Sequence, residues 1–560
     1  MRRRAVPLLV GGAMLLLALG LPAERVQFLG ASGQISALAV LCLRGALGSL
    51  GIALLALTVL APLWQPAVGM PASATGLLLG PTGWAGGPRP IAWRGLAAIT
   101  ALGLALRLPG LNSDLWLDEI GTVVTYMRLP PWQVLSTYES ANQHLLYSLL
   151  GSVSLRLFGE SAWAARLPAL LYGVAGIPLV YYLARSFADE RESLWAAGLL
   201  AVSYHHIWFS QSARGYSGMI FWVLLGSGLF LRGLARSRDR DWGAYAVCFA
   251  LGTLTLQNSA FVFISHFAIY GLALARWPSW RAAHWPLTAR VVTSMGLGLL
   301  LSLLGHSLVL PQVLGFFDGV DRTGLGWTDI GSLAAVVLSG LRSGFGLIGL
   351  AVLVLLFAVG LLSYARKSLP LLALFGLPPL LNGAAIVLLN YGAYPRSFLY
   401  LLPFGLLLAV RGARRIGELL ARPATQSVAR WLTPSALLAA IGLASLVSLV
   451  PLYRYPKQDY RAALQYVIAK RAPADPVSAV GLAGVSYRAY YAPAIETPET
   501  LAEFQALSQP GQHTWVIYSF SRDMRLRFPA LYDHIEQQFD LVARFPGTLG
   551  DGTVYVARSR

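Results

Sequence analysis

The sequence is poor in charged residues and in cysteine. Of its 560 residues, 12% are charged and 56% are hydrophobic, whereas an ordinary soluble domain carries roughly 25% charged residues. The two cysteines, Cys42 and Cys248, lie within or beside apolar runs, which excludes a disulfide framework and a cysteine metal site. Internal repeats and low-complexity tracts are also lacking. The sequence therefore predicts a polytopic α-helical membrane protein.

Acidic residues are scarce relative to basic ones, with 25 Asp+Glu against 43 Lys+Arg. Such a surplus can indicate nucleic-acid binding, but the basic residues fall in short clusters between apolar runs. Orientation in a membrane explains that distribution. We therefore expect membrane lipids, and no nucleic acid, among the partners.

Apolar runs of about 20 residues are long enough to cross a bilayer as helices. The first run follows Arg2 to Arg4 and resembles a secretory signal, but no small-x-small cleavage site precedes Glu24, so we expect an uncleaved helix. Thirteen spans are predicted: 5–21, 38–63, 92–108, 164–185, 193–210, 216–234, 243–258, 260–276, 291–310, 346–365, 369–390, 397–411 and 433–452.

Basic clusters predict the orientation of these spans. With the N-terminus in the cytoplasm, every predicted inner segment is basic: Arg2–Arg4, Arg89, Arg185 and Arg191, Arg236 to Arg240, Arg276 with Arg281 and Arg290, Arg366-Lys367, and Arg411 to Arg430. This holds only if the short apolar piece His144 to Phe158 does not cross. Arg44 fits the pattern poorly, and we expect it to extend to the interface.

This topology places the C-terminal residues outside the cell. The predicted elements there are a helix over 458–470, short strands at 477–480, 515–518 and 554–557, and helices near 500–508 and 529–539. The chain thus divides into an N-terminal extension (1–91) that ends in a Gly/Pro-rich linker from Pro66 to Pro90, a transmembrane region (92–453) with a first outer loop at 109–163, and a small extracytoplasmic α/β domain (454–560).

Two adjacent carboxylates, Asp118 and Glu119, follow an apolar stretch that ends at Arg107. Ionisable groups close to hydrocarbon are costly and usually mark a substrate path or a reaction centre. A carboxylate in such a place can act as a general base. The alternative is an acidic loop in contact with water.

Other predicted outer segments supply cations. Arg214 and Arg396 are suited to holding a phosphate through paired hydrogen bonds. Each could instead pair with Asp118 or Glu119, or contact a lipid headgroup. His144 begins the short apolar piece, and a lone histidine is more often a local hydrogen-bonding residue than a catalyst. Together these groups suit a donor that is a lipid-linked phosphate, with the base deprotonating an acceptor hydroxyl.

The motifs resemble the polyprenyl-phosphate-dependent membrane glycosyltransferases of the GT-C fold, which include protein O-mannosyltransferases and the lipid A aminoarabinose transferase. The likeness covers about residues 92–560 and is strongest to bacterial proteins similar to glycosyltransferase family 39. Its motifs are Leu115-Trp-Leu-Asp-Glu119, Gln143-His-Leu-Leu-Tyr147, Arg156-Leu-Phe-Gly159, Trp163-Ala-Ala-Arg-Leu-Pro168, Trp208-Phe-Ser-Gln-Ser-Ala-Arg-Gly-Tyr216, Pro395-Arg-Ser-Phe-Leu-Tyr400 and Gln458-Asp-Tyr-Arg-Ala-Ala463.

The resemblance implies an inverting sugar transfer from a polyprenyl-phosphate donor, at the outer face of the plasma membrane, to a lipid, glycan or protein acceptor. It implies Asp118 as catalytic base, with Glu119 beside it as a supporting acid or substrate ligand. It implies donor-phosphate binding by Arg396, Arg214 and His144, and substrate contacts by Tyr147, Gln211, Tyr216 and Tyr394. It also implies amphipathic helices along the membrane surface between Gly121 and Leu135.

The chain departs from the family pattern in three places. Relatives commonly have an acid where this chain has Ser212, and prolines where it has Leu145-Leu146. Residues 1–91 add two spans, which preserve the orientation of the remainder.

Two other classes of protein remain possible. A transporter or flippase of a lipid-linked sugar would usually show related halves, and a scaffold would leave Asp118 in water or buried in protein. Because two arginines can neutralise a departing phosphate, we expect no cofactor and no requirement for a divalent cation.

Overall fold

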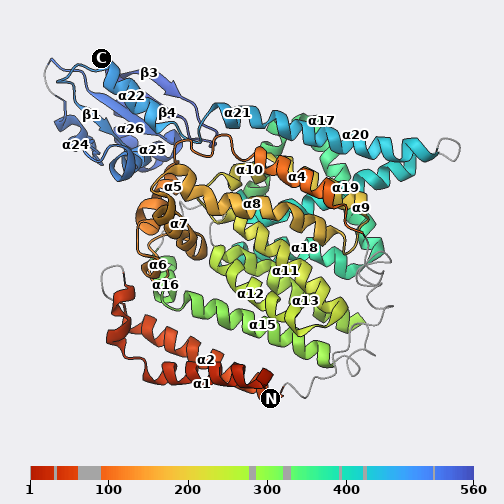
Figure 1. Cartoon of the computed structure of the whole chain (residues 1–560). Coiled ribbons are helices and arrows are strands. Elements are labelled where there is room, and N and C mark those ends of the chain that lie inside the picture. The colour runs from red at the N-terminus through yellow and green to blue at the C-terminus, as the bar shows by residue number, and fades with distance from the viewer. Residues whose placement is uncertain are drawn as a thin grey trace.

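The computed structural model describes residues 2–30, 35–60, 90–276, 285–319, 330–389, 394–420, 426–508 and 511–560. Long helices form most of the molecule, and a small α/β domain follows at the C-terminal end (Figure 1). The long helices are α1 (Arg2–Gly20), α2 (Ala37–Leu60), α4 (Trp93–Ala105), α8 (Ala162–Ala184), α9 (Glu190–Val202), α11 (Tyr216–Arg236), α12 (Asp239–Thr255), α13 (Ala260–Arg276), α15 (Trp285–His306), α17 (Ile330–Lys367), α18 (Leu369–Leu389), α19 (Leu402–Leu420) and α20 (Gln426–Val447). The predicted Gly/Pro-rich linker lies outside the described residues except for Pro90.

Each of the thirteen apolar segments lies mainly on helix over its described residues, which confirms a polytopic helical protein. By length and composition, nine helices among the described residues can cross a membrane, or ten if the bent pair of α1 and η1 (Ala23–Leu29) is one span. The predicted number of thirteen is not confirmed. Helices α4 and α9 have 13 residues each and α12 has 17, and these are short for a 30 Å hydrocarbon core at 1.5 Å per residue.

Three predicted boundaries differ from the structure for local reasons. The segment 193–210 divides at Ser203, whose hydroxyl accepts the backbone N–H of His206 and so begins the separate helix α10 (Tyr204–Ser210). The segment 397–411 begins as the 3-10 helix η5 (Pro395–Leu401) before α19. Helix α17 starts well before the predicted residue 346, because Gly346, with φ of 69°, joins two helical pieces across a kink.

The N-terminal extension is a helical hairpin. Helices α1 and α2 cross closely at two glycines, since a Cβ atom on Gly51 would lie 2.9 Å from the carbonyl oxygen of Gly11. Helix α2 packs on α15, and η1 meets α6 (Pro131–Val134) of the first outer loop. There the Ser136 hydroxyl donates to the carbonyl of Leu29. The extension therefore supports the loop that follows Asp118.

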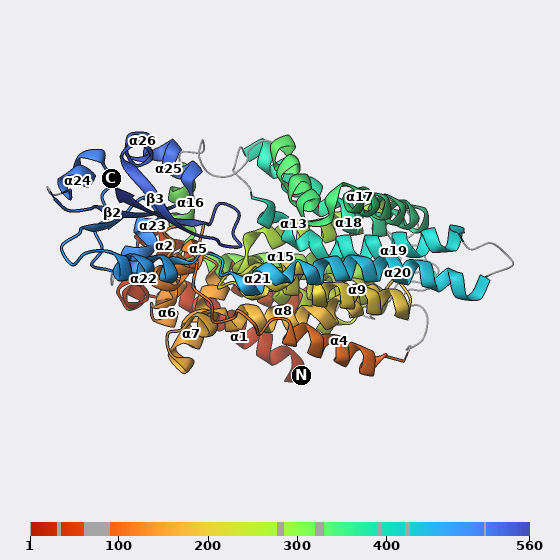
Figure 2. The same cartoon turned by 90° about the horizontal axis from the view of Figure 1, so that it is seen from above.

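Where the structure describes them, the predicted outer and inner segments lie at opposite ends of the long helices (Figures 1 and 2). At the first end lie the C-terminal domain, α5 (Leu117–Thr122), the π-helical turn Val123–Met127, α6 and α7 (Leu145–Phe158). At the other end, Arg411 pairs with Glu192 and Arg414 pairs with Asp189. Helix α7 has 14 residues, or roughly 21 Å at 1.5 Å per residue, which is too short to cross upright.

The C-terminal domain contains a four-stranded mixed sheet in the order β1-β2-β4-β3. Strands β1 (Val477–Ala479) and β2 (Trp515–Ser519) are parallel, and β2 and β3 each pair antiparallel with β4. Strands β3 (Phe539–Phe545) and β4 (Val554–Ser559) form a hairpin. The helices are α22 (Tyr460–Lys470), α23 (Gly481–Ser486), α24 (Leu501–Ala506), α25 (Ser521–Arg527) and α26 (Pro529–Gln538).

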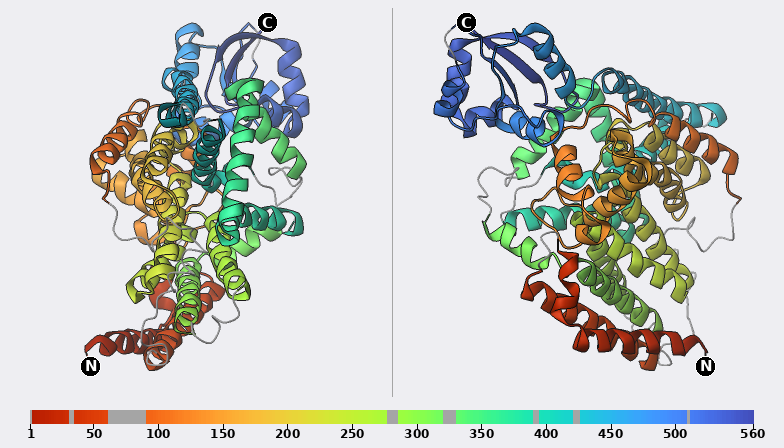
Figure 3. Two further views of the ribbon diagram at one scale, coloured as in Figure 1. Left: turned by 90° about the vertical axis from the view of Figure 1, so that its right-hand side faces the viewer. Right: turned by 60° about the vertical axis from the view of Figure 1, so that its left-hand side comes forward.

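Strand β3 was not predicted, because its sequence Phe539-Asp-Leu-Val-Ala-Arg-Phe545 follows directly on α26 without a turn signal. The domain and the N-terminal hairpin lie at opposite edges of the molecule (Figure 3). The small domain thus meets the transmembrane region on the side of α5 and α7.

Candidate functional site

Helix α5 carries both carboxylates and directs them to different surroundings. Asp118 and Glu119 are consecutive, and consecutive side chains on an α-helix point about 100° apart. The side chain of Asp118 is 14% exposed, whereas that of Glu119 is fully buried. Although Asp118 and Glu119 are adjacent in the sequence, their carboxylates therefore lie in two different environments.

Asp118 faces Arg396. The distance from its Oδ2 to the Arg396 Nη2 is 3.3 Å, and the arginine side chain is 27% exposed. That Oδ2 is buried and accepts no hydrogen bond from the residues that the structure describes. The contact is thus an ion pair without a well-formed hydrogen bond, and it leaves a carboxylate lone pair available to a proton.

Two tyrosines surround Arg396. The guanidinium carbon lies 4.4 Å from the ring centre of Tyr394, and the side chain of Tyr216 lies beside the guanidinium. Tyr394 immediately precedes η5, and Tyr216 begins α11. The two predicted substrate-binding tyrosines are therefore neighbours of the predicted phosphate ligand, and they hold its guanidinium in place.

Arg214 contacts α5 at Thr122, one helical turn after Asp118, and is 1% exposed. Its Nη1 donates to the Thr122 hydroxyl and to the carbonyl of Asn142, each at 2.9 Å. Its Nη2 lies 3.4 Å from the Nε2 of His144. The Nε atom is buried and has no hydrogen-bond partner among the described residues. Buried guanidinium N–H groups normally have partners, so this atom is available to a bound anion.

His144 is held by the backbone of Gly215, whose N–H donates to its Nδ1 at 2.8 Å. Burial, reinforced by the charges of Arg214 and Arg396, lowers the pKa of His144 well below its usual value. The ring is therefore neutral, and with Nδ1 accepting, Nε2 carries the proton. Because the Arg214 Nη2 is also a donor, the two N–H groups can share an anionic acceptor.

Glu119 is enclosed by other groups of the protein. Its Oε1 accepts from the Arg166 Nε at 2.8 Å and from the Ala213 N–H at 2.6 Å, and its Oε2 accepts from the Arg166 Nη2 at 2.6 Å. The Lys457 Nζ lies 3.6 Å from Oε1. Burial opposes the charged form, but Arg166 and Lys457 outweigh it and lower the pKa of Glu119 to about 2. In this structure Glu119 is thus a buried anchor, and its predicted role as a supporting acid or substrate ligand stays a prediction.

The Glu119 to Arg166 pair predicts a large stability effect. Replacing Arg166 by Met leaves a buried carboxylate without its main partner, which we expect to lower the free energy of unfolding by about 3–5 kcal/mol. The loss should appear as a lower midpoint in detergent thermal melts. The wild-type stabilisation should be complete above about pH 4.5, the ordinary Glu value, and should fall as the pH approaches 2.

Arg128→Met is the control for that substitution. Arg128 forms an exposed pair with Glu160 at 2.8 Å, with side chains 41% and 40% exposed. Such pairs contribute roughly 0–1 kcal/mol. Equal melting midpoints for Arg166→Met and Arg128→Met would show that the pair of Glu119 and Arg166 does not contribute more to stability than an exposed ion pair.

Two other predicted substrate ligands also serve the fold. Tyr147 is fully buried, and its hydroxyl donates to the carbonyl of Ala165 at 2.8 Å. Gln211 is 3% exposed, and its Nε2 donates to the carbonyls of Arg107 and Pro109. The Tyr147 hydroxyl and the Gln211 Nε2 thus bind within the protein and anchor the start of the first outer loop, and the predicted substrate contacts of these residues stay predictions.

Sequence reasoning gave no role to Arg166, Lys457 or Thr122. Arg166 and Lys457 neutralise Glu119, and the Thr122 hydroxyl donates to the carbonyl of Asp118 at 2.8 Å. The signal for Arg166 was present, because it lies in the motif Trp163-Ala-Ala-Arg-Leu-Pro168. A sequence motif does not indicate which residue its arginine contacts. The partner of Arg166 is Glu119, which lies 47 positions away in the sequence.

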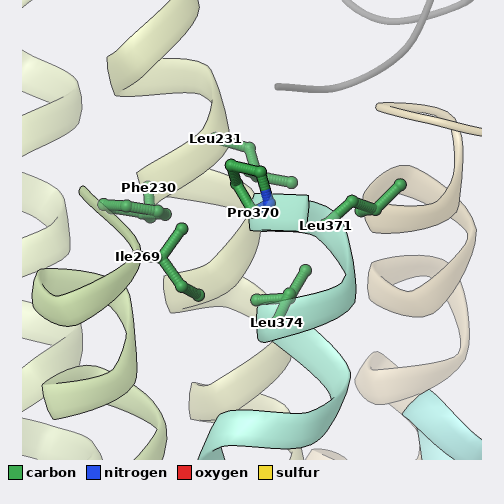
Figure 4. A pocket seen from close by; sticks show the side chains of 6 residues that line it. All are labelled: Phe230, Leu231, Ile269, Pro370, Leu371 and Leu374. Carbon is green, nitrogen blue, oxygen red and sulfur yellow. The ribbon is translucent and has the colours of Figure 1, made fainter. Parts of the chain in front are cut away.

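One cavity between the membrane helices is too small for a ligand. It measures about 10 Å³ and is lined by Phe230, Leu231, Ile269, Pro370, Leu371 and Leu374 (Figure 4). A water molecule needs roughly that volume and polar partners, so this is a packing gap. Among the described residues, no three His, Cys, Asp or Glu side chains gather around a common metal position.

Fold and site together define the class. This is a membrane-embedded helical protein that gathers a carboxylate, two arginines and a neutral histidine at one end of its helices, beside a small α/β domain. Residues 143–298 match the sequence profile of the family described as dolichyl-phosphate-mannose-protein mannosyltransferase. The match confirms the resemblance to the polyprenyl-phosphate-dependent glycosyltransferases, and it includes His144, Arg166 and Arg214.

Several solved structures are similar at low identity. ArnT from Cupriavidus metallidurans in the apo state has 16% identity and a TM-score of 0.47, with 83% of this chain and 97% of that chain covered. The archaeal oligosaccharyltransferase AglB from Archaeoglobus fulgidus has 14% identity and a TM-score of 0.49, with 83% and 74% covered. The arabinosyltransferase EmbB from Mycobacterium smegmatis has 14% identity and a TM-score of 0.44, with 80% and 47% covered. A comparison with curated protein sequences gave no match.

Proposed function

We propose that this protein transfers a sugar from a polyprenyl-phosphate donor to an acceptor hydroxyl at the outer face of the plasma membrane, with inversion at the anomeric carbon. One observation carries the proposal: a single carboxylate, Asp118, lies 3.3 Å from Arg396, and Arg214 and His144 lie on the neighbouring side of the same short helix. A proton acceptor and a set of anion ligands are thus side by side.

The chemistry follows from the two halves of the site. Asp118 takes the proton of the acceptor hydroxyl while the acceptor oxygen attacks the anomeric carbon. The bond from that carbon to the phosphate oxygen breaks, and its electron pair leaves with the polyprenyl phosphate. Arg396, Arg214 and the Nε2–H of His144 stabilise the charge that develops on the phosphate. A single displacement of this kind inverts the configuration.

The ion pair between Asp118 and Arg396 has a defined role in the proposal. In the absence of donor, each charge neutralises the other beside the apolar part of the protein. A donor phosphate competes with Asp118 for Arg396, and the carboxylate then becomes free to act as a base. Three donor groups around one phosphate can balance its charge without a cation, so the proposal includes no metal.

The outer location and the nature of the acceptor belong to the same proposal. Asp118 and the C-terminal domain share one end of the molecule, and Arg411 and Arg414 lie at the other, which the positive-inside preference assigns to the cytoplasm. A lipid, glycan or protein hydroxyl could approach from the C-terminal domain. The hydrocarbon chain of the donor would lie along the membrane helices.

An assay with purified protein tests this function. The protein would be incubated with polyprenyl-phosphate-linked hexoses and pentoses and with lipid, glycan and peptide acceptors, with and without EDTA. We expect release of polyprenyl phosphate, a glycosylated acceptor of inverted configuration, and no effect of the chelator. Movement of the lipid-linked sugar into vesicles without any glycosylated product would instead favour a transporter or flippase.

A further inference from the structure

The segment Tyr455–Arg461, which we call the strap, connects α21 (Leu449–Arg454) with the C-terminal domain and passes the beginning of α5. The backbone N–H of Leu117 donates to the Gln458 Oε1 at 2.9 Å. The N–H of Arg461 donates to the Asp114 Oδ2 at 3.1 Å. The strap therefore holds the chain on the N-terminal side of Asp118.

The strap also holds the residue after Asp118. The Lys457 ammonium lies 3.6 Å from Glu119, donates to the carbonyl of Gln211, and sits 4.8 Å from the ring centre of Trp208. Lys457 is 3% exposed and Gln458 is fully buried. Burial lowers the pKa of Lys457 to about 7, although Glu119 acts in the opposite direction. These are inner contacts rather than surface ones, so they are little screened by salt.

The β3–β4 loop of the C-terminal domain rests on the backbone of the strap. The N–H of Thr548 donates to the carbonyl of Pro456 at 3.0 Å, and that of Leu549 donates to the carbonyl of Lys457 at 3.2 Å. At Gly547 the two backbones approach so closely that a Cβ atom would lie 2.3 Å from the Lys457 carbonyl oxygen. The loop and the strap are thus in direct backbone contact.

We propose that the C-terminal domain sets the position of Asp118 through this contact, with Gly547, Lys457 and Gln458 as positioning residues. The inference rests on the proposed function for its effect on turnover. Helix α5 has six residues, and an isolated helix of that length does not hold its own geometry in water. A displacement of about 1 Å in a reacting group can reduce turnover about 100-fold.

Two glycines of the same loop provide the test. Gly547→Ala forces the loop and the strap apart, whereas a Cβ atom at Gly550 would meet nothing within 4 Å, so Gly550→Ala is the matched control. We expect Gly547→Ala to lower kcat about tenfold or more without changing the Kd for polyprenyl phosphate. We also expect hydrogen exchange of the peptide 115–122 to rise about tenfold, because Leu117 loses its acceptor. Gly550→Ala should leave kcat, the Kd and the exchange rate at the wild-type values.

A second variant, Gln458→Met, removes the acceptor of the Leu117 N–H while keeping a side chain of similar length. If Gly547→Ala does not fold, this variant tests whether the strap positions Asp118. Wild-type kcat or wild-type exchange of segment 115–122 in a folded variant of either kind would overturn the inference. If the wild-type protein itself transfers no sugar, the proposed function fails. The hydrogen-exchange rates of the peptide 115–122 do not depend on turnover. In that case they alone test whether the C-terminal domain fixes the position of α5.

Discussion

Replacing Asp118 by Asn is expected to reduce sugar transfer by about 10²–10⁴-fold while donor binding is kept. General-base catalysis contributes about that factor, and an amide of nearly the same shape cannot accept the proton. The phosphate ligands remain in place, and Arg396 loses the carboxylate that pairs with it at 3.3 Å. We therefore expect the Kd for polyprenyl phosphate to stay the same or to become smaller. Initial rates and equilibrium binding of the purified variant measure both effects.

Glu139→Gln is the matched control for this experiment. Glu139 is an exposed acid of the same outer loop, and its neutralisation changes the charge of the loop by the same amount. We expect wild-type rates from it. If Asp118→Asn turned over within about threefold of the wild type, Asp118 would lose the role of base, even though the arginines could still bind phosphate.

Replacing Arg396 by Ala is expected to weaken donor binding about 10–100-fold, since a hydrogen bond to a charged group contributes about 1.5–3 kcal/mol. It should also lower kcat about 10²–10³-fold, because the charge on the departing phosphate loses a donor. Arg396→Lys keeps the charge but not the paired geometry, so we expect intermediate values. Titration with polyprenyl phosphate and steady-state rates distinguish the two effects.

Arg128→Ala serves as the control for Arg396→Ala. It removes an exposed guanidinium whose partner is Glu160, at the same end of the molecule. Unchanged donor affinity in Arg396→Ala would count against its phosphate role. Equal losses in Arg396→Ala and Arg128→Ala would instead indicate a general effect of surface charge, which rising salt should abolish.

The helical part of the fold was predictable because hydrophobic length alone identifies membrane helices. Over their described residues, all thirteen predicted segments lie mainly on helix, and the orientation of these helices in the membrane stays a prediction. The breaks within segments were harder to predict. Ser203 ends one helix and caps the next, and Gly346 joins two helical pieces into α17. Neither residue changes the mean hydropathy of its segment, so hydropathy does not reveal these breaks.

The candidate site was predictable in part. The positions of Asp118 and Arg396 in outer segments suggested that they could meet, and the structure brings them to 3.3 Å. Their catalytic and binding roles stay predictions. The sequence did not predict that Glu119 is enclosed by protein groups, because neighbours in sequence on a helix face different partners. Arg166 and Lys457, which determine the state of Glu119, come from positions 47 and 338 residues away.

The sequence by itself determined that this chain lies in a membrane as helices, with a small α/β domain after the last span and with its ionisable outer residues in a few short segments. The reason is that burial of apolar length in lipid depends on local composition. Only the tertiary structure decided which ionisable groups meet. Asp118 faces Arg396, Glu119 is enclosed by Arg166 and Lys457, and the C-terminal domain reaches α5 through the strap. Electrostatic and hydrogen-bond contacts act over a few ångströms, and the folded chain sets those separations.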